Sequence, residues 1–183
     1  MAENRKMTDK EVANSKAEKL METIAFRAGY YRANPHRLVS DYFNISLRCF
    51  QKILLFMMMH SNYLIYCASR GQGKTFLVAL FICVRCTLYP GSKIVVCSST
   101  RTQGNETLLK IQDELMKMSP NLAYEIKDCS IGQNNAKITW KNGSWAKVCT
   151  SSDSGRGSRA NVLWVDEYVK VDLNVITMVL RKF

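Results

Sequence analysis

The sequence predicts an α/β domain with a mainly parallel sheet flanked by helices, preceded by a helical N-terminal arm over residues 1–45. From about residue 63 onward, short apolar runs of strand length alternate with helical patterns, an order typical of βαβ units. Before that point the apolar residues follow helical spacing only. With 47% hydrophobic residues and three prolines in 183, the chain can bury a core, which excludes a disordered or collagen-like protein.

Three helices are expected in the first sixty or so residues. Thr8–Glu11 has the capping-box form Thr-x-x-Glu, and an apolar stripe continues from it to about Arg32. Asn34–Pro35 is expected to end this helix and start another, with the asparagine as cap and the proline at the first helical position. Ser46 is expected to cap a third helix over 47–60, whose dense apolar residues predict that it is largely buried.

The second part of the chain carries the strand signals. Three apolar runs have the length of buried strands: 63–67, 93–97 and 162–165. Helical patterns follow them, at 74–88, at 102–118 and from about Asp172. Asn142–Gly143, between alternating segments, predicts a β-hairpin over 138–148.

Charge and cysteine content narrow the class of protein further. Lys and Arg number 26 against 15 Asp and Glu, which favours a polyanionic partner, although a solvated basic face fits equally well. The densest local excess has one acidic residue, Asp153, and five basic ones: Lys137, Lys141, Lys147, Arg156 and Arg159. Seven cysteines lie singly in apolar stretches, which indicates reduced thiols in a cytosolic protein. No apolar run is long enough to span a membrane, and the polar N-terminus is not a secretory signal.

The sharpest motif is the segment ASRGQGKT at 68–75, directly after one predicted strand and before a predicted helix. Glycine at positions 71 and 73 lets backbone N–H groups wrap around an anion, and the following helix points its N-terminus at that anion. Lys74 is expected to reach the β- and γ-phosphates, and the Thr75 hydroxyl to bind Mg²⁺. Ala68 departs from the glycine of the usual phosphate-loop pattern, a mild change. The predicted ATP-binding residues of this loop are Ser69, Arg70, Gly71, Gln72, Gly73, Lys74 and Thr75.

A second motif is the strand 162–165, which ends in two adjacent carboxylates. Beside the phosphate loop, Asp166 is expected to bind Mg²⁺, and Glu167 to orient and deprotonate the attacking water. Adjacent buried carboxylates are costly unless a metal or a basic group neutralises them. The two motifs together predict a P-loop NTPase that uses ATP and Mg²⁺.

Four local features resemble the N-terminal ATPase domain of the large terminase subunit, the motor that packages DNA into tailed-phage and herpesvirus capsids. Residues 47–51 (LRCFQ) resemble the upstream motif in which a glutamine, here Gln51, reads adenine. Arg70 within the phosphate loop is common in the family. Residues 93–102 resemble the second strand and loop shared with superfamily 2 helicases, and 154–159 resemble the Arg-Gly segment before the acidic strand.

The resemblance implies the rest of the machinery. Arg70 or Arg156 would contact the γ-phosphate, the latter placed like an arginine finger that reaches a neighbouring subunit, and both stay open. It also implies double-stranded DNA as a partner, a homo-oligomeric ring on a capsid portal, a small terminase subunit and a location in the host cell cytoplasm. The expected activity is therefore ATP hydrolysis coupled to DNA translocation.

Terminases belong to the additional-strand class of P-loop NTPases, in which the strand at the centre of the sheet follows the acidic strand in sequence. Only 168–183 follow Glu167, and much of that stretch has a helical pattern. The expectation is thus an incomplete ATPase domain over 46–183, truncated after the acidic strand and without the family's nuclease domain. Two alternatives remain: a superfamily 2 helicase or translocase lobe, and a nucleotide-binding piece of a larger assembly that does not hydrolyse ATP.

Overall fold

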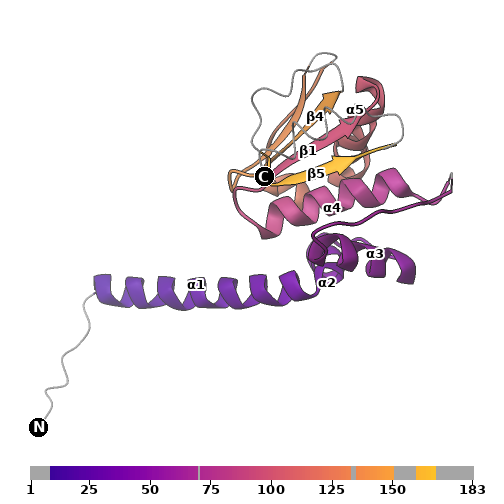
Figure 1. Cartoon of the computed structure of the whole chain (residues 1–183). Coiled ribbons are helices and arrows are strands. Elements are labelled where there is room, and N and C mark those ends of the chain that lie inside the picture. Colours follow the sequence, from indigo (N-terminus) through magenta and orange to yellow (C-terminus); the bar gives the residue numbers. More distant parts are fainter. Residues whose placement is uncertain (1–8, 70, 133–134, 151–159, 168–183) are drawn as a thin grey trace, which may run out of the picture.

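The computed structural model describes residues 9–69, 71–132, 135–150 and 160–167, and these form an α/β arrangement (Figure 1). The helices are α1 (Asp9–Ala33), α2 (Pro35–Asp41), α3 (Cys49–His60), α4 (Lys74–Leu88), α5 (Arg101–Lys110), the π-helical turn η1 (Ile111–Leu115), α6 (Met116–Met118) and α7 (Pro120–Glu125). The strands are β1 (Lys93–Ser98), β2 (Ile126–Ile131), β3 (Ala136–Trp140), β4 (Trp145–Thr150) and β5 (Val162–Val165).

Within the described residues the sheet has five strands in the order β2-β3-β4-β1-β5. The strands β4, β1 and β5 are parallel, whereas β2, β3 and β4 are antiparallel. The prediction of a mainly parallel sheet is therefore wrong, and the sheet is mixed. The reason lies in the connections, because the hairpin at Asn142–Gly143 joins β3 to β4 by a short turn that only antiparallel strands permit. This hairpin was predicted, and β2 was not.

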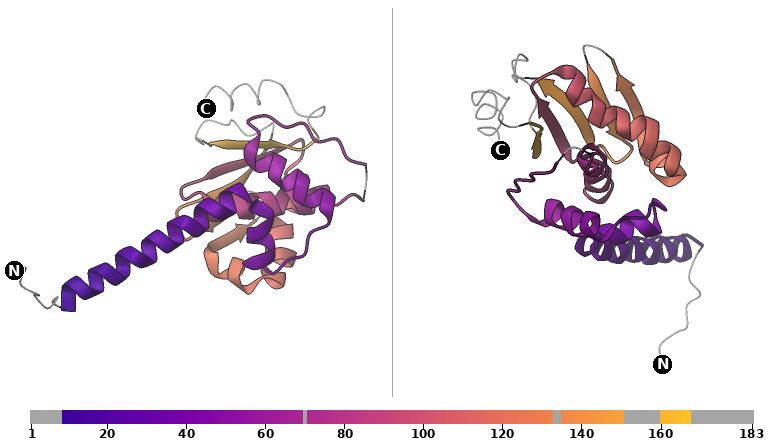
Figure 2. Two further views of the ribbon diagram at one scale, coloured as in Figure 1. Left: turned by 90° about the horizontal axis from the view of Figure 1, so that it is seen from below. Right: turned by 90° about the vertical axis from the view of Figure 1, so that its right-hand side faces the viewer.

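The helix α4 fills the space between the sheet and the N-terminal helices. Its sequence is apolar almost all the way round, and ten of its fifteen residues are buried. The described helices lie beside one face of the sheet, as the right-hand view of Figure 2 shows. The helix α5 approaches that face closely at Gly104, since a Cβ there would lie 2.4 Å from the Val148 side chain. These contacts hold the starts of α4 and α5 near the ends of β1 and β5.

Most predicted helix positions are confirmed, and the start of the third is corrected. The helix α1 ends at Ala33 and α2 begins at Pro35, although the Asn34 side chain makes no cap and instead donates to the Tyr30 carbonyl. The helix α3 begins two residues later than expected, so Ser46 is not its cap. The N-cap is Arg48, and its backbone N–H donates a hydrogen bond to the Gln51 side-chain oxygen in the first turn of the helix.

The prediction that α3 is largely buried is also wrong. Three of its residues are buried, Leu55, Met58 and Met59. Its large exposed side chains are Phe50, Ile53, Phe56 and Met57. Apolar density alone marked this helix as interior, but only one of its faces meets the rest of the described chain.

The strand predicted at 63–67 does not form. Tyr63 is 89% exposed and Ile65 is 92% exposed, whereas Leu64 and Tyr66 pack against the core. The strand β5 pairs with β1 on one side, and no described strand pairs with its other side. An apolar segment becomes a strand only where a neighbour satisfies its backbone N–H and C=O groups, and 63–67 has no such neighbour among the described strands.

Several predictions lie outside the described residues: Thr8 of the capping box, Arg70, the segment 154–159 with Arg156, and the helix from Asp172. The boundary at residue 45 also stays a prediction. In the described part of the chain, no helix combines the length and the apolar character that crossing a membrane requires.

Candidate nucleotide-binding site

The predicted phosphate loop leads into α4 through two glycines in the left-handed region. Gly71 has φ +82° and Gly73, the residue that precedes the helix, has φ +72°. Apart from the glycine itself and its chain neighbours, no heavy atom of the described residues lies within 4 Å of where a Cβ would stand at either position. The N-cap of α4 is Gly73, which has no side chain to cap the first N–H groups of the helix. The loop thus has the backbone shape and the helix terminus that an anion requires.

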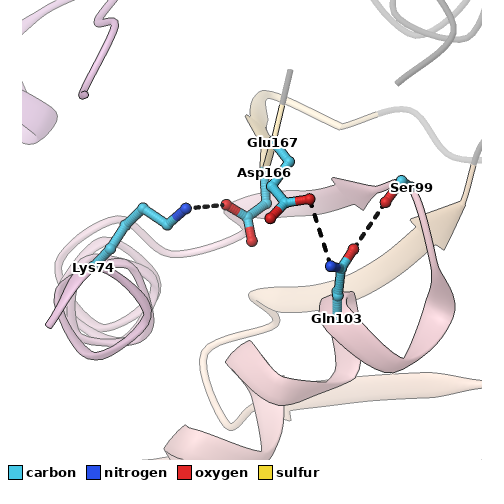
Figure 3. Close-up of polar contacts among 5 residues, drawn as sticks. All are labelled: Lys74, Ser99, Gln103, Asp166 and Glu167. Carbon is cyan, nitrogen blue, oxygen red and sulfur yellow. Dashed lines mark hydrogen bonds and ion pairs between the residues drawn. The ribbon is translucent and has the colours of Figure 1, made fainter. Parts of the chain in front are cut away.

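Lys74 and Asp166 meet at the end of β5. The Lys74 Nζ atom lies 3.0 Å from Asp166 Oδ1, and Figure 3 shows the lysine reaching from the start of α4 to the carboxylate. The Asp166 backbone N–H donates to the Cys97 carbonyl at 2.8 Å, which fixes the end of β5 against β1. Side-chain exposures of 34% and 22% leave the pair accessible to solvent on one side. The two motifs that the sequence analysis placed together therefore do meet.

Glu167 occupies an unusual backbone conformation beside this pair. Its φ is +50°, in the left-handed region that non-glycine residues rarely adopt and that is often found at functional sites. The Gln103 amide donates to Glu167 Oε2 at 3.5 Å, and its carbonyl accepts from the Ser99 hydroxyl at 2.8 Å (Figure 3). Ser99 and Gln103 thereby link the glutamate to the loop between β1 and α5.

Sequence reasoning missed Ser99 and Gln103 as site residues. Ser99 lies in the segment 93–102, which resembles the strand and loop shared with superfamily 2 helicases, and Gln103 follows that segment directly. The resemblance assigned no role to either side chain. The available signal was position, because both follow the carboxyl end of β1, next to the strand that carries the acidic pair. Side chains at that edge of parallel strands lie close together.

Thr75 and Asp166 stay the predicted Mg²⁺ ligands of this site. Magnesium in nucleotide sites takes one or two protein oxygens and completes its shell with water and phosphate. Among the described residues no group of three or more His, Cys, Asp and Glu side chains is close enough to hold a metal ion. A hydroxyl and one carboxylate suit a metal that arrives with a phosphate, so the donor set is compatible with Mg²⁺.

The neighbouring titratable group on β1 is Cys97. Burial, and to a smaller extent the nearby Cys149 thiol, raise the pKa of the Cys97 thiol to about 11. Cys97 therefore stays neutral near the acidic pair at ordinary pH, and it adds no negative charge to the site.

Three further predicted residues, Ser69, Gln72 and Gln51, have no contact described with Lys74, Asp166 or Glu167. Ser69 and Gln72 are exposed in the loop, and Gln51 lies on α3 with its side-chain oxygen bonded to the Arg48 N–H. Adenine reading by Gln51 stays a prediction.

A family model described as terminase large subunit, T4likevirus-type, N-terminal, matches residues 65–183, well over half of the chain. The chain belongs to the large terminase subunit family. The matched range contains both Lys74 and Asp166, so the terminase match covers both halves of the site. This membership gives the terminase chain a role in phage DNA packaging. A comparison with curated proteins finds no match.

Proposed function

We propose that this terminase chain is the ATPase part of a viral DNA-packaging motor, hydrolysing ATP to move double-stranded DNA into a procapsid. The observation that carries the proposal is the 3.0 Å ion pair between Lys74 and Asp166. It supports a site in which a phosphate-binding lysine and an acidic strand end act on one nucleotide.

Binding would begin at the phosphate loop. The N–H groups around Gly71 and Gly73 and those of the first turn of α4 would hold the phosphate oxygens. Lys74 would exchange Asp166 for the β- and γ-phosphates, since an ammonium on a flexible stem can swing between two anions. Thr75 and Asp166 would then hold Mg²⁺, which supplies charge neutralisation to the phosphates.

Hydrolysis would depend on Glu167. Its carboxylate would accept a proton from the attacking water, while Gln103 keeps it oriented through the 3.5 Å hydrogen bond. By resemblance, Arg70 or Arg156 would stabilise the charge that spreads over the equatorial phosphate oxygens.

Coupling to packaging would involve further partners. We propose a homo-oligomeric ring on the capsid portal, working with a small terminase subunit in the host cell cytoplasm. Release of the γ-phosphate would shift the loops that grip DNA. DNA contact would be independent of sequence and sensitive to salt, because lysine and arginine would bind the phosphate backbone.

A second candidate is a nucleotide-binding piece that does not hydrolyse ATP. The segment 63–67 favours this candidate, because it does not form a strand. The phosphate loop is therefore anchored to the fold by α4, which follows it, and by no described strand before it. A loosely held site binds its ligand but positions the reacting groups poorly.

The test compares wild-type protein with Lys74→Ala and Glu167→Gln, measuring binding of a fluorescent ATP analogue and release of phosphate. We expect Lys74→Ala to lose nucleotide binding, and Glu167→Gln to keep it while phosphate release falls at least about 100-fold. Lys16→Ala and Glu18→Gln, comparable changes at exposed positions on α1, are the controls. Binding without phosphate release in the wild type would favour the second candidate, and equal rates for wild type and Glu167→Gln would exclude Glu167 as the base.

A further inference from the structure

The sheet presents a basic patch on the face away from the described helices. Alternation along the strands places Lys137, Trp145 and Lys147 on this face, and Lys93 lies beside Trp145 in the parallel register of β1 and β4. Lys93 and Lys137 are exposed, whereas Trp145 and Lys147 are half-buried. We call these four residues the lysine–tryptophan patch.

Two lysines of the patch face each other directly. Lys137 on β3 is paired with Lys147 on β4 across an antiparallel ladder, and like charges in such a pair are destabilising. Their ammonium groups lie 5.7 and 5.9 Å from the centre of the Trp145 ring. Neither lysine forms an ion pair with another described residue, so a cation–π contact is what the fold offers each of them.

Acidic residues are scarce around the patch. The stretch 126–150 contains four lysines and one acidic residue, Asp128. Asp128 is paired with Thr139, which in turn is paired with Trp145, so the carboxylate stands two strands away from the tryptophan. The patch therefore combines a half-buried aromatic ring with positive charge that nearby described side chains leave unbalanced.

We propose that the lysine–tryptophan patch binds the phosphate backbone of double-stranded DNA, with Trp145 packing against a sugar. The choice of DNA as the polyanion rests on the packaging role proposed above, and the placement of the contact rests on the patch itself. A phosphate between Lys137 and Lys147 would relieve the repulsion of the facing charges, and an aromatic ring beside it would add an apolar contact.

Salt dependence supplies the main test. The full chain would be titrated with an unlabelled 30-base-pair duplex of arbitrary sequence at several salt concentrations. In a Lys137→Gln/Lys147→Gln double variant we expect the slope of log affinity against log salt to fall by about 0.9, because the two lysines share one phosphate and a lost phosphate contact removes about 0.9. The matched control is Lys16→Gln/Lys19→Gln, which removes the same charge from two exposed positions on α1 and should leave the slope unchanged. Equal slopes in the two double variants would overturn the proposal.

Tryptophan fluorescence gives a second readout that a general charge effect would not move. We expect DNA to quench the emission of the wild type and to leave Trp145→Phe, which keeps Trp140 and Trp164, almost unchanged. Trp140 is only 1% exposed, so it is a poor reporter of surface binding. Poly-glutamate is the competing polyanion, and quenching by it but not by DNA would reassign the patch to an acidic protein segment and refute DNA binding there.

The outcome is separable from that of the ATPase proposal. Binding of the fluorescent ATP analogue should be unchanged in the Lys137→Gln/Lys147→Gln variant, since neither lysine contacts Lys74 or Asp166. Failure of the wild-type ATPase, with a smaller salt slope in Lys137→Gln/Lys147→Gln than in its control, would therefore refute the first proposal alone. Normal ATPase activity with equal slopes in the two double variants would refute the second alone.

Discussion

Two apolar segments, 63–67 (YLIYC) and β1 (KIVVCS), differ in structure, because only β1 forms a strand. Each is a short apolar run, and each is followed by a loop and a helix. In β1 every residue after Lys93 is buried, and Ile94 is fully buried, whereas Ile65 is 92% exposed. The difference is the surroundings, because β1 has β4 on one side and β5 on the other. A strand is therefore a property of the pair of neighbours as much as of the segment.

The largest expected effect is the difference in stability between alanine substitutions of Ile94 and of Ile65. We expect Ile94→Ala to lower the free energy of unfolding by about 2–5 kcal/mol, because it removes buried methyl groups and leaves a cavity. Ile65→Ala should change it by less than about 0.5 kcal/mol. Chemical denaturation monitored by circular dichroism measures both. A comparable loss for Ile65→Ala would mean that 63–67 is buried in solution.

The cysteines of the two segments sharpen the comparison. Cys67 is exposed and Cys97 is buried, and burial raises the Cys97 pKa to about 11. Since the raised pKa favours the neutral thiol, the stability that it represents is present below the ordinary pKa near 9 and is lost as the pH rises towards 11. At pH 8 we expect iodoacetamide to modify Cys67 at least about 100-fold faster than Cys97.

Mass spectrometry of the alkylated peptides measures this ratio, and the same reaction in denaturant is the control, where the two rates should become similar. Similar rates in the native protein would show that β1 opens as readily as 63–67.

The smallest effect is expected where the phosphate loop meets β5. Replacing Lys74 by Met should change the free energy of unfolding by less than about 1 kcal/mol, because the ion pair with Asp166 is partly solvated. The difference should shrink further in high salt. A loss of several kcal/mol would mean that the pair is a structural anchor of the loop rather than a pair free to exchange for phosphate.

Much of the site could be predicted because its signals are local. Helix α4 begins at Lys74 and β1 at Lys93, as the sequence indicated, and the acidic pair follows β5. Gln103 could not be predicted as a partner of Glu167. The two residues are 64 positions apart in the sequence, and only the fold brings their side chains to 3.5 Å. The lysine–tryptophan patch was visible in part as a local excess of lysine, but its facing charges appear only in the strand register.

Two of the errors share one cause. Strand 63–67 and the buried α3 were both predicted from apolar content, which reports the tendency to be buried and not the partner that does the burying. The mainly parallel sheet was predicted from the alternation of strand and helix patterns, which does not apply to strands joined by a hairpin. The unpredicted β2 is the converse, because its half-exposed residues carry no apolar run, yet it pairs with β3. Edge strands depend on hydrogen bonding to a neighbour more than on apolar content.

The sequence by itself determined the helices and turns at the site, the left-handed glycines before α4, and the order of basic and acidic residues along the chain, because these depend on backbone sterics and on neighbours within a few positions. Only the tertiary structure decided which apolar segment became a strand, that Gln103 meets Glu167, and that Lys137 faces Lys147. Each of these requires two distant segments to pair in one register, and the energy of that pairing belongs to neither segment alone.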